Sequence, residues 1–168
     1  MVLSKSELIS SLQHEVRVLL HLASKVDPAQ LDYRPTPRQR STIELLRYLT
    51  IMGPIHLHGA RGKTWDIQTW LDKWNREEAV AKTLTLDEVK ESIAKQSALF
   101  ADVIGACSDV DLRAEIALFG RKATRGTWLV RLVLCHYPAY RMQLFMHLKA
   151  CGQDELNTMN LWAGMDQP

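Results

Sequence analysis

The sequence lacks long apolar runs. No stretch approaches the roughly 18 consecutive apolar residues that are typical of a membrane-spanning helix. The first residues, MVLSKSELISS, contain no apolar segment of the kind found in secretory signal peptides. We therefore expect a cytoplasmic protein with no membrane partner.

Cysteine and net charge are also sparse. Cys107, Cys135 and Cys151 are odd in number and form no CxxC pair, which argues against a disulfide scaffold and predicts reduced thiols. The 21 Lys and Arg residues nearly balance the 19 Asp and Glu residues. The resulting net charge of +2 is too small for a dedicated nucleic-acid binder, so we expect no nucleic-acid partner.

Strand patterns are missing as well, and apolar residues instead recur at the helical period of 3.6. Helices are predicted over residues 5–25, from 41 to beyond 54, over 85–105 and over 127–150. Ser41–Glu44 and Thr85–Glu88 match the capping box that starts a helix, and Gly152 marks the end of the last helix. We predict an all-α fold, a four-helix bundle, in a single domain over residues 1–168.

Three segments connect these helices. Residues 26–40 contain three prolines and predict a long non-helical connection between the first and second helices. Residues 59–84 predict a short extra amphipathic helix, whose Trp65, Trp70 and Trp74 form a satellite core or line the mouth of a pocket. Residues 106–126 predict a loop with one short extended or turn segment.

Prolines also fall inside two predicted helices. Pro54 should kink the second helix or end its regular part, and Pro138 should bend the fourth helix between His136 and Tyr140. The reason is that proline lacks the N–H that the preceding turn needs.

The inward stripe of the fourth helix is unusually polar. At about 100° per residue, eight side chains fall within a sector of roughly 120°: Leu129, Leu132, Val133, His136, Tyr140, Gln143, Leu144 and His147. Polar groups on a buried face need partners, and Tyr48 points inward from the second helix. We therefore predict a ligand pocket formed by Tyr48, His136, Tyr140 and Gln143.

The other polar residues near this stripe have simpler interpretations. His56 and His58 lie two residues apart and point about 160° away from each other on a helix, so they form a poor metal pair. His147 lies about 16 Å along the helix axis from His136 and is predicted to be a hydrogen-bonded core histidine. Arg141 is expected to be solvated or paired with an acid. The tail, residues 157–168, is expected to pack back through Trp162.

Short motifs resemble those of a known family. They are the capping box that runs through Ser41-Thr-Ile-Glu44 to Tyr48, the late His136-x-x-x-Tyr140-Arg141-x-Gln143, the preceding LDYRPTPRQR, and Asn160-Leu-Trp162 in the tail. Together they resemble the DinB superfamily, also called the DinB/YfiT-like or bacillithiol- and mycothiol-dependent transferase fold. The likeness spans nearly the whole chain.

The resemblance implies a four-helix bundle, often dimeric, in which one His of the second helix and an HxxxH pair of the fourth bind nickel, zinc or a similar ion. In active members this ion is thought to activate a low-molecular-weight thiol for transfer. The implied ligand positions fall on Tyr48, His136 and Tyr140 of this sequence, so tyrosine replaces histidine at two of them. A neutral phenol is a poor ligand, because the metal must displace a proton of pKa near 10.

Three hypotheses about function follow. In the first, the protein forms a homodimer, needs no cofactor, and binds a small molecule at the degenerate site or keeps that site as a vestige. In the second, His136 with substitute ligands such as Tyr48, Tyr140 or His56 holds nickel or zinc for a thiol S-transferase or hydrolase. In the third, the protein is a dimeric interaction module and the polar cluster has no chemical role.

Overall fold

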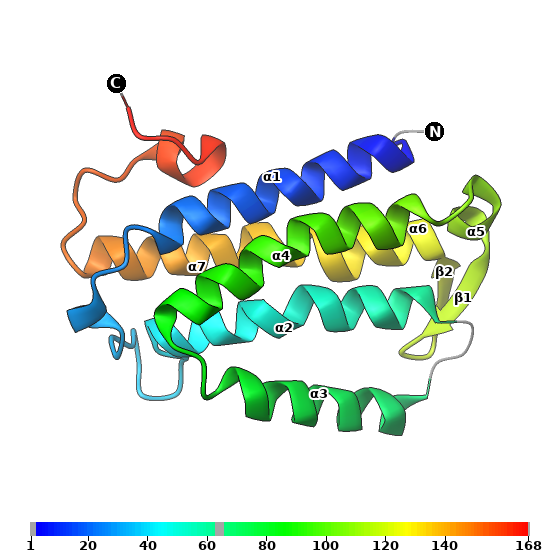
Figure 1. The fold of residues 1–168 in the computed structure, drawn as a ribbon, viewed down its shortest axis with the longest axis horizontal. Coiled ribbons are helices and arrows are strands. Elements are labelled where there is room, and N and C mark those ends of the chain that lie inside the picture. The colour runs from blue at the N-terminus through cyan, green and yellow to red at the C-terminus, as the bar shows by residue number, and fades with distance from the viewer. Residues whose placement is uncertain (1–2, 63–65, 168) are drawn as a thin grey trace.

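The computed structural model describes residues 3–62 and 66–167. The elements in chain order are α1 (Lys5–Ala23), a 3₁₀ turn (Pro28–Gln30), α2 (Thr42–Arg61), α3 (Ile67–Ala81), α4 (Leu86–Gly105), α5 (Asp109–Arg113), β1 (Glu115–Leu118), β2 (Arg121–Thr124), α6 (Arg125–Trp128), a π-helical segment (Leu129–Leu134), α7 (His136–Ala150) and a second π-helical segment (Met159–Ala163). The predicted all-α four-helix bundle is confirmed, with α1, α2, α4 and α7 as its helices (Figure 1).

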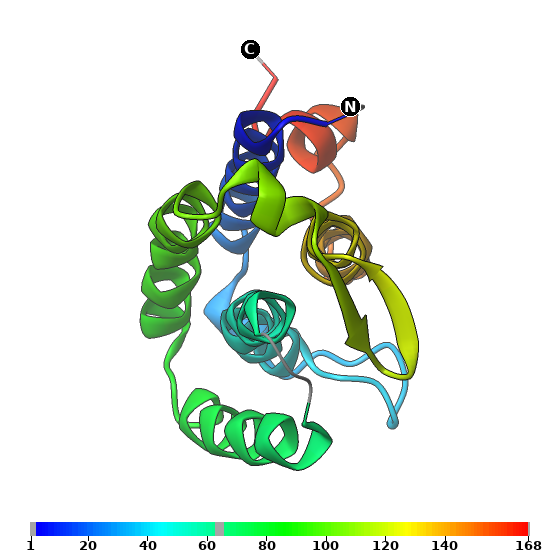
Figure 2. The ribbon, with the colours of Figure 1, turned by 90° about the vertical axis from the view of Figure 1, so that its right-hand side faces the viewer.

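The long helices pack around one apolar core. α1 and α2 each pack against both α4 and α7, so the four surround the core when the bundle is viewed end-on (Figure 2). α3 runs back along the outer side of α2, and this return makes α2 and α4 run in the same direction (Figure 1). The predicted extra helix is therefore a full-length crossover. Trp65 lies outside the described residues.

Capping boxes set the starts of the bundle helices as predicted. Ser41 and Glu44 cap α2, and Thr85 and Glu88 cap α4, each through side-chain contacts to the backbone of the other residue. The predicted inward face of α2 is also confirmed, since Leu45, Leu49, Met52, Ile55 and His56 are buried and Tyr48 is half-buried.

α2 continues through Pro54 without ending there. Proline has no N–H for the Thr50 carbonyl, which lies four residues back. The buried side chain of Gln96 on α4 replaces this donor: its Nε2 atom lies 3.0 Å from the carbonyl oxygens of both Leu49 and Thr50. The missing bond is thus supplied from a neighbouring helix, and the helix remains regular up to Arg61.

Tyr137 of α7 completes this arrangement. Its hydroxyl donates a hydrogen bond to Oε1 of Gln96, and the ring is almost fully buried with its edge toward Phe100, at a centroid distance of 5.9 Å. Gly53 makes room for it, because a Cβ atom at that position would overlap the Tyr137 hydroxyl oxygen. Gly53 and Pro54 therefore form a socket for one residue of α7.

The fourth bundle helix is not one continuous α-helix. The Cys135 N–H donates to the carbonyl oxygen of Val130 at 2.9 Å, five residues back, which is the π-helical pattern. The irregularity lies before Pro138, not between His136 and Tyr140 as predicted. Pro138 falls in the first turn of α7, where N–H groups need no partner within the helix.

The π-helical segment changes which residues face inward. On a regular α-helix, side chains four residues apart point in directions that differ by about 40°. The wider π turn removes this difference, so that residues four apart point the same way. The buried residues are therefore spaced by four through the segment and by three or four after it: Leu129, Val133, Tyr137, Arg141, Leu144, His147 and Leu148. The prediction that Gln143 points inward is wrong, because its side chain is exposed.

Arg141 lies in the core as half of a buried ion pair. Its Nη1 atom lies 2.7 Å from Oε2 of Glu15 on α1, and the Arg141 side chain is only 2% exposed. Pairing with an acid was one of the two expectations, and solvation was the other. Burial raises the pKa of the Glu15 carboxyl, although the charge of Arg141 opposes this rise.

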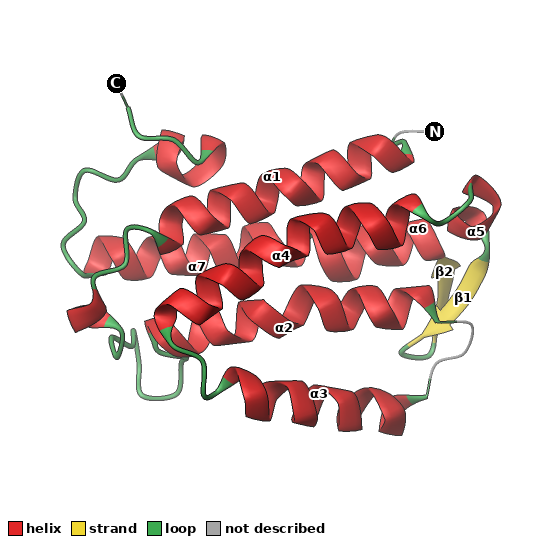
Figure 3. Cartoon of the chain, viewed as in Figure 1, coloured by secondary structure: helices red, strands yellow, loops and turns green. Residues whose placement is uncertain are grey.

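The segment between α4 and α6 contains a β-hairpin where mainly a loop was predicted. β1 and β2 pair antiparallel, with Glu115 opposite Thr124 (Figure 3). Phe119 and Gly120 form the turn with φ angles of 52° and 73°, as a two-residue hairpin turn requires. With four residues in each strand, the pattern is too short to stand out from the sequence.

The C-terminal tail folds back onto the bundle and Trp162 takes part in this packing, as predicted, because the Arg141 guanidinium carbon lies 4.9 Å from the Trp162 ring centroid. Trp162 remains 58% exposed, whereas Asn160 and Leu161 are buried. Asn160 Nδ2 lies 3.1 Å from Nε2 of His21, and Nε2 of His14 lies 2.9 Å from the Trp162 carbonyl oxygen. Both histidines of α1 are therefore partly covered by the tail.

No helix within residues 3–62 and 66–167 is both long enough and apolar enough to cross a membrane.

The Gln96 side chain provides the first test. We expect Gln96→Leu to lower the free energy of unfolding by about 2–3 kcal/mol, because the Thr50 carbonyl and the Tyr137 hydroxyl lose buried partners. Urea denaturation measures this change. The exposed Gln143→Leu should change the free energy of unfolding by less than about 0.5 kcal/mol. Equal effects of the two substitutions would refute the role assigned to Gln96.

Candidate functional site

The structure brings three of the four predicted pocket residues together. The Tyr48 hydroxyl donates a hydrogen bond to the Tyr140 hydroxyl at 3.2 Å, and the two ring centroids are 4.8 Å apart. The His136 ring centroid lies 6.1 Å from that of Tyr140. Gln143 is not part of this group, since its side chain is exposed.

Further rings extend this group. His56 of α2 lies with its ring centroid 5.0 Å from that of His136, and it also contacts Trp70 and Trp74 of α3, at 6.0 and 6.1 Å. Trp74 also contacts Tyr48 at 5.7 Å. We call these six residues the aromatic cluster: Tyr48, His56, Trp70, Trp74, His136 and Tyr140.

The sequence contains a signal for the three cluster residues that the pocket prediction does not include, which are His56, Trp70 and Trp74. His56 lies eight residues after Tyr48, which places both on one helical face, and Trp70 and Trp74 are four residues apart. Sequence alone does not show which side of the bundle α3 covers. The predicted satellite core is confirmed for Trp70 and Trp74, which pack with Ile51, Ile55 and Ala81, and the pocket-mouth role stays a prediction.

Burial keeps two residues of the aromatic cluster, His56 and Tyr48, uncharged near neutral pH. Burial and, to a smaller extent, the nearby His136 lower the pKa of His56 from 6.5 to about 4. Burial also raises the pKa of Tyr48 well above its ordinary value, and the hydrogen bond with Tyr140 adds to this rise. The α2 side of the cluster therefore offers a neutral imidazole and a protonated hydroxyl group.

One polar atom in the cluster is unsatisfied. Nδ1 of His136 is buried, and no residue in the described part of the chain forms a hydrogen bond with it. A buried polar atom without a partner costs about 1–3 kcal/mol. Such an atom at the centre of a ring cluster is a natural contact point for a bound molecule.

A cavity of about 240 Å³ reaches the cluster at Tyr48. It lies between α2 and the end of α3, and its wall includes Tyr48, Ile51 and Ala81. His136 and Tyr140 do not line it. The guanidinium carbon of Arg40 lies 4.1 Å from the Tyr48 ring centroid, at the outer side of the cluster.

The remaining predicted residues lie outside the cluster. His58 is exposed, as its spacing from His56 predicted. His147 is buried, with Nδ1 3.2 Å from the Thr42 hydroxyl and the ring edge against Tyr33 at 5.5 Å. Its predicted role as a hydrogen-bonded core histidine is confirmed, with a side chain of α2 as the partner.

Comparison with known proteins identifies the family. The sequence model of the DinB superfamily matches residues 11–137, a range that begins within α1, ends in the first turn of α7 and contains both Tyr48 and His136. The chain belongs to the DinB superfamily. No curated protein matches it.

Solved structures of DinB-like proteins share the fold. A DinB-like protein of Bacillus subtilis (YjoA) superposes with a TM-score of 0.67 at 19% identity, covering 89% of this chain and 94% of its own. A DinB-like protein of Bacillus cereus ATCC 10987 gives a TM-score of 0.67 at 14% identity, covering 88% and 92%. At these identities the likeness concerns the fold alone.

The metal site that the DinB resemblance implies does not fit the residues found here. Its three positions hold Tyr48, His136 and Tyr140, and two of these form a phenol–phenol hydrogen bond. Ligation by Tyr48 would remove a proton whose pKa burial has raised. Within residues 3–62 and 66–167, no three His, Cys, Asp or Glu side chains are placed to hold a metal ion.

The pKa of His56 predicts a pH dependence of stability. In the unfolded chain the His56 imidazole takes up a proton near pH 6.5, whereas in the folded chain it stays neutral down to about pH 4. Stability from neutral His56 is therefore complete above pH 6.5 and is lost as the pH falls toward 4. When the pH is lowered from 7 to 4.5, the free energy of unfolding should fall by about 2 kcal/mol more for wild type than for His56→Phe.

Urea denaturation at both pH values, with a chelator present, measures this difference. The exposed His58→Phe serves as the control, because it should lose as much stability as wild type. If His56→Phe also behaves like wild type, the assigned pKa is wrong.

Proposed function

We propose that this member of the DinB superfamily binds a small molecule at the aromatic cluster. The observation that carries the proposal is the buried, unsatisfied Nδ1 of His136 beside the His56 ring, which stays neutral. A ligand with one hydrogen-bonding group would satisfy this atom and would remove the free-energy cost of leaving it unpaired. The homodimer and the cytoplasmic location remain predictions.

The chemistry of the cluster favours a planar molecule. Tyr140, His136 and the two tryptophans of α3 offer ring faces and edges, which contribute about 0.5–1.5 kcal/mol for each well-placed ring contact. The hydroxyl groups and the imidazole nitrogens supply polar contacts that fix the orientation. The neutral state of His56 favours an uncharged group on the part of the ligand that enters the cluster.

α3 provides a route by which the cluster can open. Ala81 is its only buried residue, and Trp70 and Trp74 pack with Ile51 and Ile55 in a small apolar group separate from the main core. A helix with few buried contacts opens at a lower free-energy cost than the core helices do. The rings that cover His56 thus belong to the bundle's most weakly held long helix.

Benzamide, a neutral one-ring amide, tests the proposal. We expect it to bind with millimolar affinity and to shift the NMR signals of the His136 and Tyr140 side chains. Tyr48→Ala should weaken binding by about fivefold or more, as expected when a ring contact of about 1 kcal/mol is lost.

Tyr33→Ala is the matched control, because Tyr33 is also half-buried but contacts His147 instead of the cluster. It should leave the affinity for benzamide unchanged. The proposal fails if benzamide leaves the His136 signals unshifted, or if both tyrosine variants weaken binding equally.

A metal centre is the second candidate, and the ring separation of His56 and His136 favours it. Two imidazoles that ligate one ion through bonds of about 2.1 Å have ring centroids roughly 5 Å apart, and the observed distance is 5.0 Å. Metal analysis of protein purified without an affinity tag separates the two candidates.

Under our proposal, we expect far less than one nickel or zinc ion per chain. Stoichiometric metal that is lost in His136→Ala and retained in His14→Ala would establish the metal centre instead. His14 is a suitable control because it lies on α1 and contacts the C-terminal tail.

A further inference from the structure

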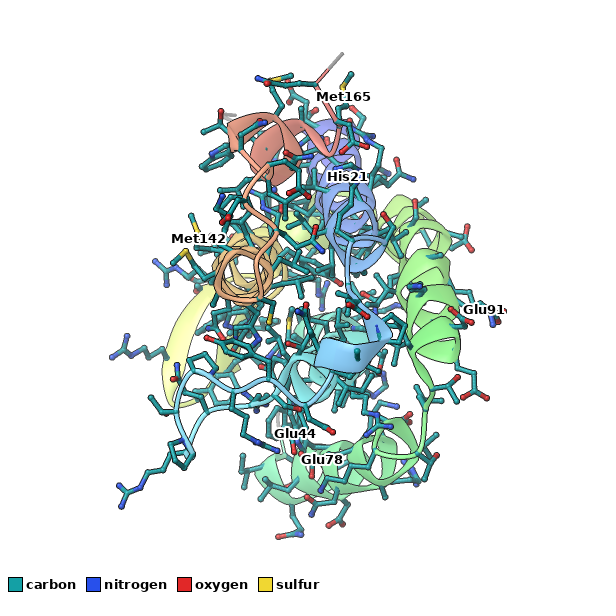
Figure 4. The ribbon with its side chains drawn as sticks, turned by 90° about the vertical axis from the view of Figure 1, so that its left-hand side faces the viewer. His21, Glu44, Glu78, Glu91, Met142 and Met165 are labelled. Atoms are coloured by element: carbon teal, nitrogen blue, oxygen red, sulfur yellow. The ribbon has the colours of Figure 1, made fainter. Side chains whose placement is uncertain are left out.

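The cavity beside Tyr48 has a charged wall that the proposed function does not use. Three cations, Arg40, Arg47 and Lys82, line it together with two acids, Glu44 and Glu78. Figure 4 shows Glu44 and Glu78 close together where the start of α2 approaches the end of α3. The partners of these five side chains decide which ligand charge the cavity favours.

Both acids already have cationic or backbone partners. Glu44 accepts two hydrogen bonds of 2.7 Å from Arg34, which does not line the cavity, and a third of 3.0 Å from the Ser41 N–H. These bonds lower the pKa of Glu44 and keep it ionised. Glu78 pairs with Lys82 at 2.9 Å, one helical turn away. Neither acid has an uncompensated charge to offer a cationic ligand.

Two guanidinium groups, in contrast, form no close ion pair with a carboxylate, although the charge of Arg40 acts on Glu44 at longer range. Among the described residues, no acidic oxygen lies within 4.0 Å of Arg40 or Arg47. Both groups are nevertheless held in place. Arg40 lies over the Tyr48 ring at 4.1 Å, and Arg47 donates from Nε and Nη2 to the Leu84 carbonyl oxygen at 2.9 and 2.7 Å. Preoriented guanidinium groups are the preferred partners of carboxylates and phosphates.

The rest of the wall fits an apolar body of one-ring size. Ile51, Ala81 and the Tyr48 ring provide apolar surface between the two arginines. The volume of about 240 Å³ is ample, since a cavity of about 150 Å³ in another protein holds benzene. The site therefore combines a cationic rim with an apolar wall.

We propose that the cavity binds a small organic anion, with its carboxylate or similar group on Arg40 and Arg47 and its apolar body against Ile51, Ala81 and Tyr48. This inference rests on the proposed function, because it names the ligand class of a site that shares Tyr48 with the aromatic cluster. The anionic end stays at the cavity and the neutral end faces the cluster. An amphipathic, planar acid meets both conditions.

Benzoate and benzamide differ in charge but hardly in shape, and so they test the inference as a pair. We expect benzoate to bind at least about tenfold more tightly than benzamide, as charge-assisted hydrogen bonds to arginine require. Raising NaCl from about 20 to about 300 mM should weaken benzoate binding severalfold and leave benzamide binding unchanged. Isothermal titration calorimetry or NMR titration measures both affinities.

Three arginine variants locate the anion. Arg40→Gln and Arg47→Gln should each weaken benzoate binding by about tenfold and leave benzamide binding within about twofold. Arg38→Gln is the matched control, because Arg38 is exposed in the same connection and does not line the cavity. Circular dichroism of each variant confirms that the fold is retained.

The outcomes distinguish this inference from the proposed function. If benzamide binds as tightly as benzoate and both lose affinity in Tyr48→Ala, the small-molecule site stands and the anion preference is wrong. If Arg38→Gln weakens benzoate as much as Arg40→Gln does, the anion binds elsewhere on the surface and the inference fails. If neither probe binds, both proposals fail.

Discussion

A missing hydrogen bond in α2 determines how the rest of the bundle is arranged. Pro54 leaves the Thr50 carbonyl without its helical donor, and the amide of Gln96 reaches across from α4 to replace it. This fixes Gln96 so that its oxygen points toward α7, where the Tyr137 hydroxyl binds it in the space left by Gly53. Three helices are thereby joined at one buried point.

That point sets the rotation of α7 and hence the position of the candidate site. With Tyr137 held in the socket, His136 and Tyr140 are turned toward α2, where Tyr48 and His56 lie. On the other side of α7, the buried pair of Arg141 and Glu15 holds the helix against α1. Breaking such a pair is costly because it leaves a buried charge. The site is thus positioned by core contacts that are not part of it.

Much of the bundle was predictable from sequence because its signals are local. The capping boxes at Ser41 and Thr85 and the apolar period of α1, α2 and α4 depend only on residues within a few turns. The π-helical segment could not be predicted this way. It depends on where Tyr137 meets Gln96, a contact between residues 41 positions apart. The regular helical period therefore predicts that Gln143 points inward, and it does not predict Tyr137 and Arg141 as core residues.

The same distinction applies to the candidate site. Tyr48, His136 and Tyr140 were predictable as a group, since facing helices of a bundle bring inward residues together. The contacts of the α3 tryptophans and the position of Arg40 were not predictable, because both depend on how segments outside the bundle fold over α2. The close ion pair of Glu44 with Arg34, which leaves Arg40 interacting with Glu44 only at longer range, is likewise a property of the folded connection.

Tyr48 connects two environments that differ in charge. Its hydroxyl lies inside, hydrogen-bonded to Tyr140 and kept protonated by burial, whereas its ring lies under the guanidinium of Arg40 at the cavity. A histidine at this position would present a lone pair to an ion, but a buried phenol remains protonated and donates a hydrogen bond. Tyr48 is therefore suited to neutral or anionic acceptors and not to cations. Arg40 and Arg47, which form no close ion pair and line the adjacent cavity, favour ligands of that same kind, so both environments of Tyr48 select against a cationic partner.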